Sequence, residues 1–83
     1  MRVTVRLFAR LRDIAGSSEV DRPLPPQATA QQIWRELVAE FPDLDAYTRV
    51  VSVARNLEYV SWATPLDDGD EIAFLPPVSG GQG

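Results

Sequence analysis

The sequence contains no cysteine, no histidine and no lysine, and each absence removes a class of chemistry. Without cysteine there is no disulfide, no thiolate nucleophile and no zinc–thiolate site. Without histidine the chain lacks the side chain that most often acts as a general base near neutral pH. Without lysine it forms no Schiff base and offers no side-chain amine for an isopeptide bond. Carboxylates, hydroxyls, arginines and the chain termini remain, so we do not expect a self-sufficient enzyme.

The chain also lacks a long apolar run and an excess of positive charge. No stretch approaches the ~20 apolar residues that a membrane-spanning helix needs. The net charge of −4 argues against binding to nucleic acid or to an anionic membrane, both of which favour basic patches. The start of the chain, MRVTVRLFAR, has no signal-peptide pattern, so we expect a cytoplasmic protein. A length of 83 residues predicts one domain.

Hydrophobic periodicity predicts most of the secondary structure. The segment RVTVRLF alternates strictly and places Val3, Val5 and Leu7 on one face, as in a half-buried strand. A short helix is expected in ARLRDIAG and should end at Gly16. The weaker strand SEVDRPLP contains a proline, which is typical of a sheet edge. Further along, VVSVARN, LEYVSW and EIAFL predict a third strand, a short extended segment and a last strand.

Residues 29–41 form the clearest predicted helix. Thr29 and Gln32 have the spacing of a capping box, and Pro42 follows the end. One apolar stripe, more typical of core than of a ligand pocket, contains Ala30, Ile33, Trp34, Leu37 and Phe41. One long helix among these strands predicts an α+β fold, the ubiquitin-like β-grasp, with the helix packed on a mixed sheet of about four to five strands.

The segment LDDGDE gathers several carboxylates: Asp67, Asp68, Asp70 and Glu71. A calcium loop spreads its ligands over about twelve residues with a glycine at the sixth position, which this spacing does not match. Asp-Gly between two strands is a frequent turn signal. We therefore predict a turn and no metal site.

Two large apolar side chains are expected on the outer face of the sheet. The alternation that turns the first strand's valines inward turns Phe8 outward, and inward Ile72 and Phe74 turn Leu75 outward. The first and last strands of a β-grasp are neighbours, so Phe8 and Leu75 should share one solvent-exposed patch. Two such side chains beside the end of the last strand favour a partner surface.

The last eight residues, PPVSGGQG, join a segment whose backbone is restricted by prolines to one whose glycines permit many backbone conformations. Pro76 and Pro77 favour an extended path away from the sheet. Gly80 and Gly81 have no side chains to obstruct a narrow tunnel. Residues 76–81 would reach ~20 Å when extended. We expect a β-grasp domain over residues 1–75 and a C-terminal tail over 76–83 that delivers a terminal carboxyl to an active site in another protein.

The stretches FARLRDIAG and PLDDGDEIAFLPPVSGG, with the β-grasp pattern between them, resemble the small subunit of molybdopterin synthase. The related thiamine-pathway carrier is usually shorter and lacks FARLR. The resemblance implies that an E1-like adenylyltransferase activates the C-terminal glycine with ATP, that the glycine becomes a thiocarboxylate, and that the carrier itself binds no cofactor. It also implies that the tail enters the large catalytic subunit, which converts cyclic pyranopterin monophosphate to the dithiolene of molybdopterin.

Carried over by position, the resemblance makes Gly81 the functional terminus. The arm before it consists of Pro76, Pro77, Val78, Ser79 and Gly80. Partner contacts fall at Phe8, Arg12, Tyr59 and Leu75. The strand alternation independently supports Phe8 and Leu75, whereas Arg12 fits an exposed helix charge equally well.

Gln82 and Gly83 depart from the family pattern, which normally ends at the glycine pair. A thiocarboxylate requires a free carboxyl, and Gly81 has none while Gln82 is attached. Three interpretations remain open: a protease trims the chain after Gly81; Gly83 is the working terminus; or the two residues are foreign to the natural chain or mark lost carrier activity.

A second hypothesis belongs to a different class. The chain would be a ubiquitin-like sulfur carrier or protein modifier for another pathway, such as tRNA thiolation or thiamine or cysteine synthesis. The absence of lysine excludes self-linked chains but not attachment to other proteins. A neighbouring gene for the large synthase subunit favours the first hypothesis, and one for a metalloprotease or another sulfur-using enzyme favours the second.

Overall fold

The first strand has the alternation that the sequence predicts. In the computed structural model, which describes residues 1–77, β1 spans Arg2–Leu7. Its inward side chains are buried: Val3, Val5 and Leu7. Helix α1 then covers Ala9–Ala15 and ends at Gly16, whose φ of 76° is a left-handed conformation that glycine adopts without steric penalty.

The remaining strands and the long helix follow the predicted order, with a 3₁₀ helix after the long helix. They are β2 (Glu19–Pro23), α2 (Ala30–Glu40), the 3₁₀ helix η1 (Pro42–Tyr47), β3 (Ser52–Arg55), β4 (Glu58–Tyr59) and β5 (Glu71–Leu75). The strands form one five-stranded sheet in the order β2-β1-β5-β3-β4. β1 pairs with β5 in parallel, and the other neighbours pair antiparallel.

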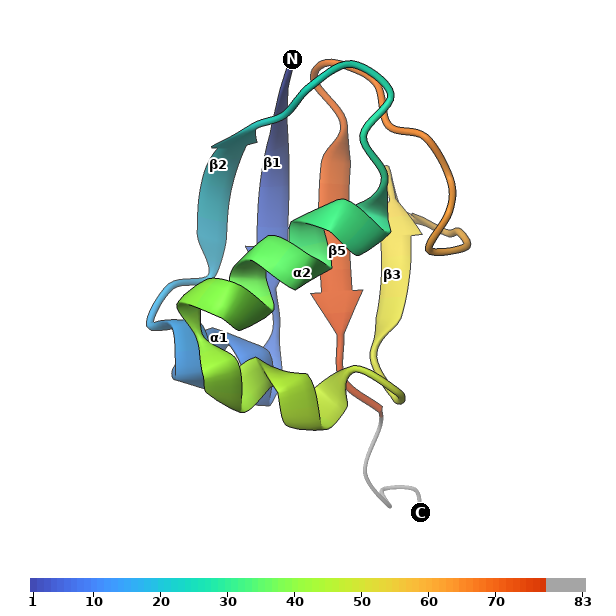
Figure 1. Cartoon of the computed structure of the whole chain (residues 1–83). Coiled ribbons are helices and arrows are strands. Elements are labelled where there is room, and N and C mark those ends of the chain that lie inside the picture. The colour runs from blue at the N-terminus through green and yellow to red at the C-terminus, as the bar shows by residue number, and fades with distance from the viewer. Residues whose placement is uncertain (78–83) are drawn as a thin grey trace.

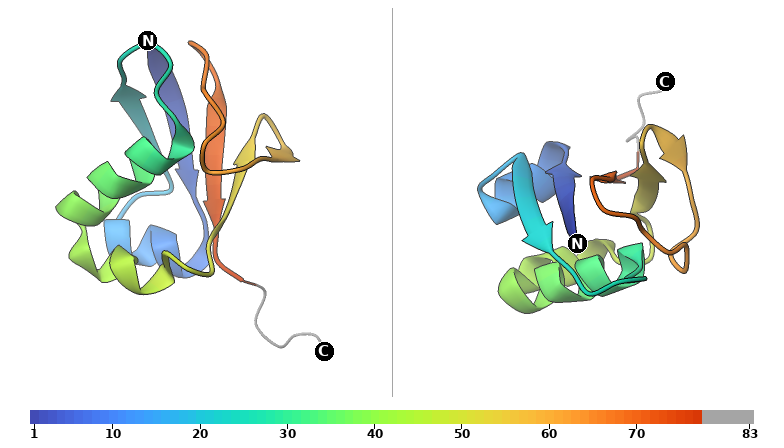
Figure 2. Two further views of the ribbon diagram at one scale, coloured as in Figure 1. Left: turned by 45° about the vertical axis from the view of Figure 1, so that its right-hand side comes forward. Right: turned by 90° about the horizontal axis from the view of Figure 1, so that it is seen from above.

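Helix α2 crosses one face of this sheet (Figure 1). The view from above places the strands on one side and α2 with η1 on the other (Figure 2). This mixed sheet under one long helix is the β-grasp, so the predicted fold class is confirmed. The proline-containing strand, β2, lies at the sheet edge, also as predicted.

The ends of α2 are set by local hydrogen bonds. The Gln32 amide N–H donates to Thr29 Oγ1 at 3.4 Å, and the Thr29 amide N–H donates to Gln32 Oε1 at 2.9 Å. This is the predicted capping box. The inner face carries the predicted stripe, with Phe41 only partly buried: Ala30, Ile33, Trp34 and Leu37. None of the helices in residues 1–77 is long and apolar enough to span a membrane.

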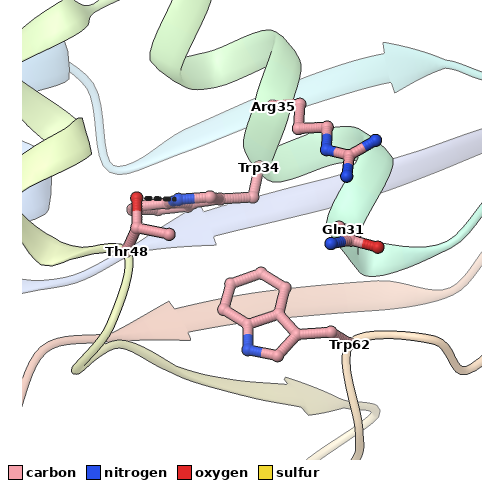
Figure 3. Close-up of a pocket in the computed structure, with 5 residues that line it drawn as sticks. All are labelled: Gln31, Trp34, Arg35, Thr48 and Trp62. Carbon is pink, nitrogen blue, oxygen red and sulfur yellow. Dashed lines mark hydrogen bonds between the residues drawn. The ribbon is translucent and has the colours of Figure 1, made fainter.

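Trp34 joins the helix to the sheet. Its ring centroid lies 5.1 Å from that of Phe74 on β5 and 6.0 Å from that of Trp62. Its Nε1–H donates to Thr48 Oγ1 at 2.9 Å, so the buried indole keeps a polar partner (Figure 3). The core assignment of Trp34 is confirmed, and Trp62, which the sequence placed only in an extended segment, packs against the same core.

Replacing Trp34 should test this packing. We expect Trp34→Ala to lower the free energy of unfolding by ~3–5 kcal/mol, because a side chain that is 2% exposed leaves a cavity. Urea denaturation measures the change. Trp34→Phe is the control, since it keeps an aromatic ring and loses the bond to Thr48. A loss below ~1 kcal/mol for Trp34→Ala would contradict the buried position.

Candidate functional site

A hollow of about 200 Å³ lies on the sheet face opposite α2. The β5 residues that line it alternate along the strand with Ile72 and Phe74, which are buried beneath the helix. Its lining residues come from both ends of the chain: Phe8, Ala54, Leu57, Tyr59, Glu71, Ala73 and Leu75. Three of the four residues expected at partner contacts therefore meet here, and Arg12 does not.

The pairing of β1 with β5 brings Phe8 and Leu75 together. Leu7 is opposite Phe74 in the parallel register, and Phe8 and Leu75 are the next residues of the two chains. Phe8 is still extended, at φ −122°, before α1 begins. Both side chains line the hollow, so the prediction that they lie together is confirmed.

The expected exposure of the two side chains holds for only one of them. Phe8 is 39% exposed, as predicted, whereas Leu75 is half-buried. The prediction for Leu75 was wrong because alternation gives the direction of a side chain and not its neighbours. Leu75 lies in the hollow beside β3, where Ser52 is its pairing partner.

The hairpin of β3 and β4 forms one wall of the hollow. Tyr59, opposite Ala54 in the hairpin, is 76% exposed. Leu57, in the turn between the strands, is 91% exposed. No sequence pattern pointed to Leu57. The available signal was the asparagine before it, because Asn often occupies two-residue hairpin turns.

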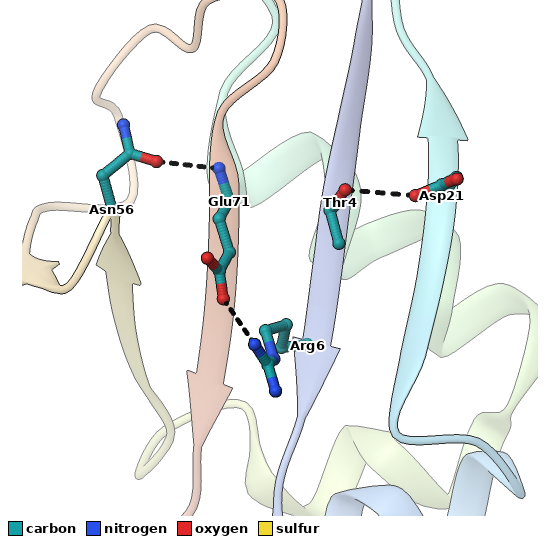
Figure 4. Close-up of polar contacts among 5 residues, drawn as sticks. All are labelled: Thr4, Arg6, Asp21, Asn56 and Glu71. Atoms are coloured by element: carbon teal, nitrogen blue, oxygen red, sulfur yellow. Dashed lines mark hydrogen bonds and ion pairs between the residues drawn. The ribbon is translucent and has the colours of Figure 1, made fainter.

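Asn56 fastens this turn to the start of β5. Its backbone N–H donates to the Glu71 carbonyl oxygen at 2.8 Å. Its side-chain Oδ1 accepts from the Glu71 backbone N–H at 2.9 Å (Figure 4). Its Nδ2 donates to Oδ1 of Asp70 at 3.0 Å. The other oxygen of this buried carboxylate accepts from the Asp67 amide at 2.8 Å. With Gly69 at φ 86°, the acidic segment is the predicted turn.

Polar side chains border the hollow along β1 and β5. Arg6 Nη1 lies 3.0 Å from Oε2 of Glu71, on the same sheet face (Figure 4). The guanidinium carbon of Arg6 lies 6.0 Å from the centroid of the Phe8 ring. An exposed ion pair of this kind contributes little to stability. Its consequence is that two of the charges beside the apolar patch compensate each other.

Arg12 lies outside the hollow. Its Nε is 3.9 Å from Oδ1 of Asp13, and the Arg12 side chain is 56% exposed. This position matches an exposed helix charge, the alternative to a partner contact that the sequence left open.

The residues expected in the tail are only partly described. Pro76 is half-buried and Pro77 exposed, and both lie outside helices and strands. The others lie outside the described residues: Val78, Ser79, Gly80, Gly81, Gln82 and Gly83.

The composition of the hollow is suited to protein contact. Its volume lies below the ~300–1,000 Å³ of typical small-molecule pockets, and its lining is mostly apolar with a polar border. Within residues 1–77, no group of three or more His, Cys, Asp or Glu side chains is placed to hold a metal ion. The arrangement offers an anchoring surface at the point where the C-terminal residues leave the sheet.

A second hollow, of about 140 Å³, lies beside the core aromatics. Gln31, Arg35 and Thr48 line it together with the two indoles, and Figure 3 shows the Thr48 hydroxyl already accepting from Trp34. It belongs to the packing of α2, and size does not decide between the hollows, because two of about 250 and 340 Å³ also lie along α2 and η1. We take the sheet-face hollow as the candidate site because its lining brings β1, the β3–β4 hairpin and the end of β5 together.

Comparison with known proteins gives consistent matches over nearly the whole chain. A family model described as the ThiS family matches residues 5–81. The molybdopterin synthase sulfur carrier subunit of Arabidopsis thaliana is 37% identical over 79 residues, which cover 95% of this chain and 82% of that one.

Two solved structures are also similar. Small archaeal modifier protein 1 of Haloferax volcanii is 31% identical, with a TM-score of 0.79 over 93% of this chain and 98% of that one. A chain in the complex of subunits 1 and 2 of the molybdopterin-converting factor of Helicobacter pylori is 30% identical. Its TM-score is 0.67 over 98% of this chain and 100% of that one.

The bonds of Asn56 give a prediction for stability. Asn56→Gly should lower the free energy of unfolding by ~1–3 kcal/mol, because it leaves the buried Asp70 carboxylate short of one donor while glycine keeps the positive φ. Asn56→Ala should cost ~1–2 kcal/mol more, since alanine is strained there. Thermal unfolding measures both. Stability equal to that of the unsubstituted protein in both variants would show that the side chain does not hold the turn.

Proposed function

The chain belongs to the ThiS family, and from that membership we propose that it is the sulfur-carrier subunit of a molybdopterin synthase. The observation that carries the proposal is the apolar hollow at the end of β5. This hollow lies where a partner must bind if it is to receive residues that follow Leu75. The name of the Arabidopsis relative gives the pathway, and the Helicobacter complex shows that a relative associates with a second subunit.

The proposed chemistry takes place at the C-terminal carboxyl. On an E1-like adenylyltransferase, the carboxylate of the terminal glycine attacks the α-phosphate of ATP, which releases pyrophosphate and forms an acyl-adenylate. A sulfur donor then displaces AMP and leaves a thiocarboxylate. The large synthase subunit takes this sulfur for dithiolene formation. The chain supplies no histidine, cysteine or lysine to these steps, so the catalytic side chains belong to the partners.

The residues of this chain position the reacting carbon. β5 is hydrogen-bonded on both sides, to β1 and to β3, and therefore fixes the point from which the tail starts. Pro76 and Pro77 then restrict the backbone at the root of the tail. A partner held by Phe8, Tyr59 and Leu75 would meet that root in one orientation, which is the condition for delivering a terminal atom accurately.

A second candidate function has its own support. The similarity to small archaeal modifier protein 1 favours a protein modifier, or a carrier for another sulfur pathway, built on the same fold. Deleting the gene distinguishes the two. Loss of molybdenum-enzyme activity supports the synthase subunit, whereas loss of protein conjugates or of thiolated tRNA supports the alternative.

A charge placed in the hollow should separate binding from folding. Leu75→Glu should leave the unfolding midpoint within a few degrees, because the side chain is only half-buried, and should weaken binding to the large subunit at least about tenfold. Calorimetric titration measures the affinity. Gln31→Glu is the matched control, since it adds the same charge to the exposed side of α2. Equal affinities for both variants and the unsubstituted chain would remove the hollow from the interface.

The length of the tail gives a further prediction. A chain that ends at Gly81 should be a better substrate for the adenylyltransferase than one that ends at Gly83. Two additional residues move the carboxyl by up to ~7 Å, and a displacement of ~1 Å can cost about a hundredfold in rate.

ATP–pyrophosphate exchange with the two chains measures the difference. Equal rates would make Gly83 the sulfur-bearing residue and trimming unnecessary. Activation of neither chain would contradict the carrier function.

A further inference from the structure

The turn between β3 and β4 holds a leucine in a conformation that leucine disfavours. Arg55 pairs with Glu58, so Asn56 and Leu57 alone connect the strands. Their φ angles are 50° and 74°. Two positive φ values define the hairpin turn whose twist suits the flanking strands, and its second position is typically glycine. At Leu57 the Cβ atom crowds the backbone instead.

Contacts on both sides of the turn hold its backbone in this strained conformation. The bonds from Asn56 to Asp70 and Glu71 hold its first residue against β5. The last pair of the hairpin fixes the residue after Leu57. Local strain of this kind persists where the rest of the fold determines the backbone, and it is frequent at binding surfaces.

The Leu57 side chain does not pack in the core, so core packing does not offset the backbone strain. It is 91% exposed, more than Phe8, Val50 or Tyr59. A single exposed apolar residue is ordinary. A leucine that is strained, exposed and placed on the wall of an apolar hollow is not explained by folding, because a glycine or asparagine would fit the same backbone better.

We propose that Leu57 is an anchor for the large synthase subunit and inserts into an apolar recess of that protein when it binds the sheet-face hollow. The inference rests on the proposed function. Two observations select this occupant: Leu57 lines the same hollow as Phe8, Tyr59 and Leu75, and this hollow lies at the end of β5, at the root of the tail. A partner that receives the tail covers this wall as it approaches.

Three variants of the full chain test the anchor. Leu57→Asn accepts the positive φ and removes the apolar contact, so the unfolding midpoint should stay equal or rise by a few degrees. Its affinity for the large subunit should fall at least about tenfold, as for a central interface residue. Leu57→Gly should lose the same affinity. Leu57→Met keeps both the strain and the apolar side chain, and should bind within about threefold of the unsubstituted chain.

Calorimetric titration measures the affinity of each variant for the large subunit and for the adenylyltransferase. Unchanged affinity of Leu57→Asn for the large subunit overturns the anchor, and so does a loss seen only with the adenylyltransferase. An equal loss for Leu57→Met also overturns it, because the apolar contact would then be immaterial. An unsubstituted chain that does not bind the large subunit overturns the proposed function itself, and the anchor with it.

Discussion

The parallel pairing of β1 with β5 is the constraint on which the rest of the molecule depends. It brings the first strand and the last strand of the described chain side by side at the centre of the sheet. Leu7 and Phe74 close the core at this point, and the next residues, Phe8 and Leu75, turn to the other face. One register therefore sets both the hydrophobic core and the candidate binding surface. A slip of one residue would exchange the two faces of β5.

The hairpin of β3 and β4 completes the surface through contacts that are distant in sequence. Asn56 reaches Asp70 and Glu71, fourteen and fifteen residues along the chain. These bonds hold the hairpin, which forms one wall of the hollow, against β5. The Asp70 carboxylate of the acidic turn accepts one of them. The Asp70 carboxylate of the acidic segment thus has a structural role in the predicted turn and in holding the hairpin.

Sequence patterns predicted what depends on local periodicity. Strict alternation gave the faces of β1 and β5, and the Thr29–Gln32 spacing gave the start of α2. The exposure of Leu75 could not be read from the sequence, because it depends on which strand lies beside it. The conformation of Leu57 could not be predicted for the same reason. Long-range bonds of the turn impose a positive φ on a residue that prefers a negative one. Such local conflicts are expected where function, and not stability, selects the residue.

The proposed function requires the chain to carry sulfur on its C-terminal carboxyl. Intact mass spectrometry of the protein from cells that lack the large synthase subunit tests it most directly, because the loaded carrier should accumulate when its acceptor is missing. We expect a species in which one terminal oxygen is replaced by sulfur, and the same spectrum identifies the terminal residue. Only the unmodified carboxylate in those cells, with the adenylyltransferase and a sulfur source present, would contradict it.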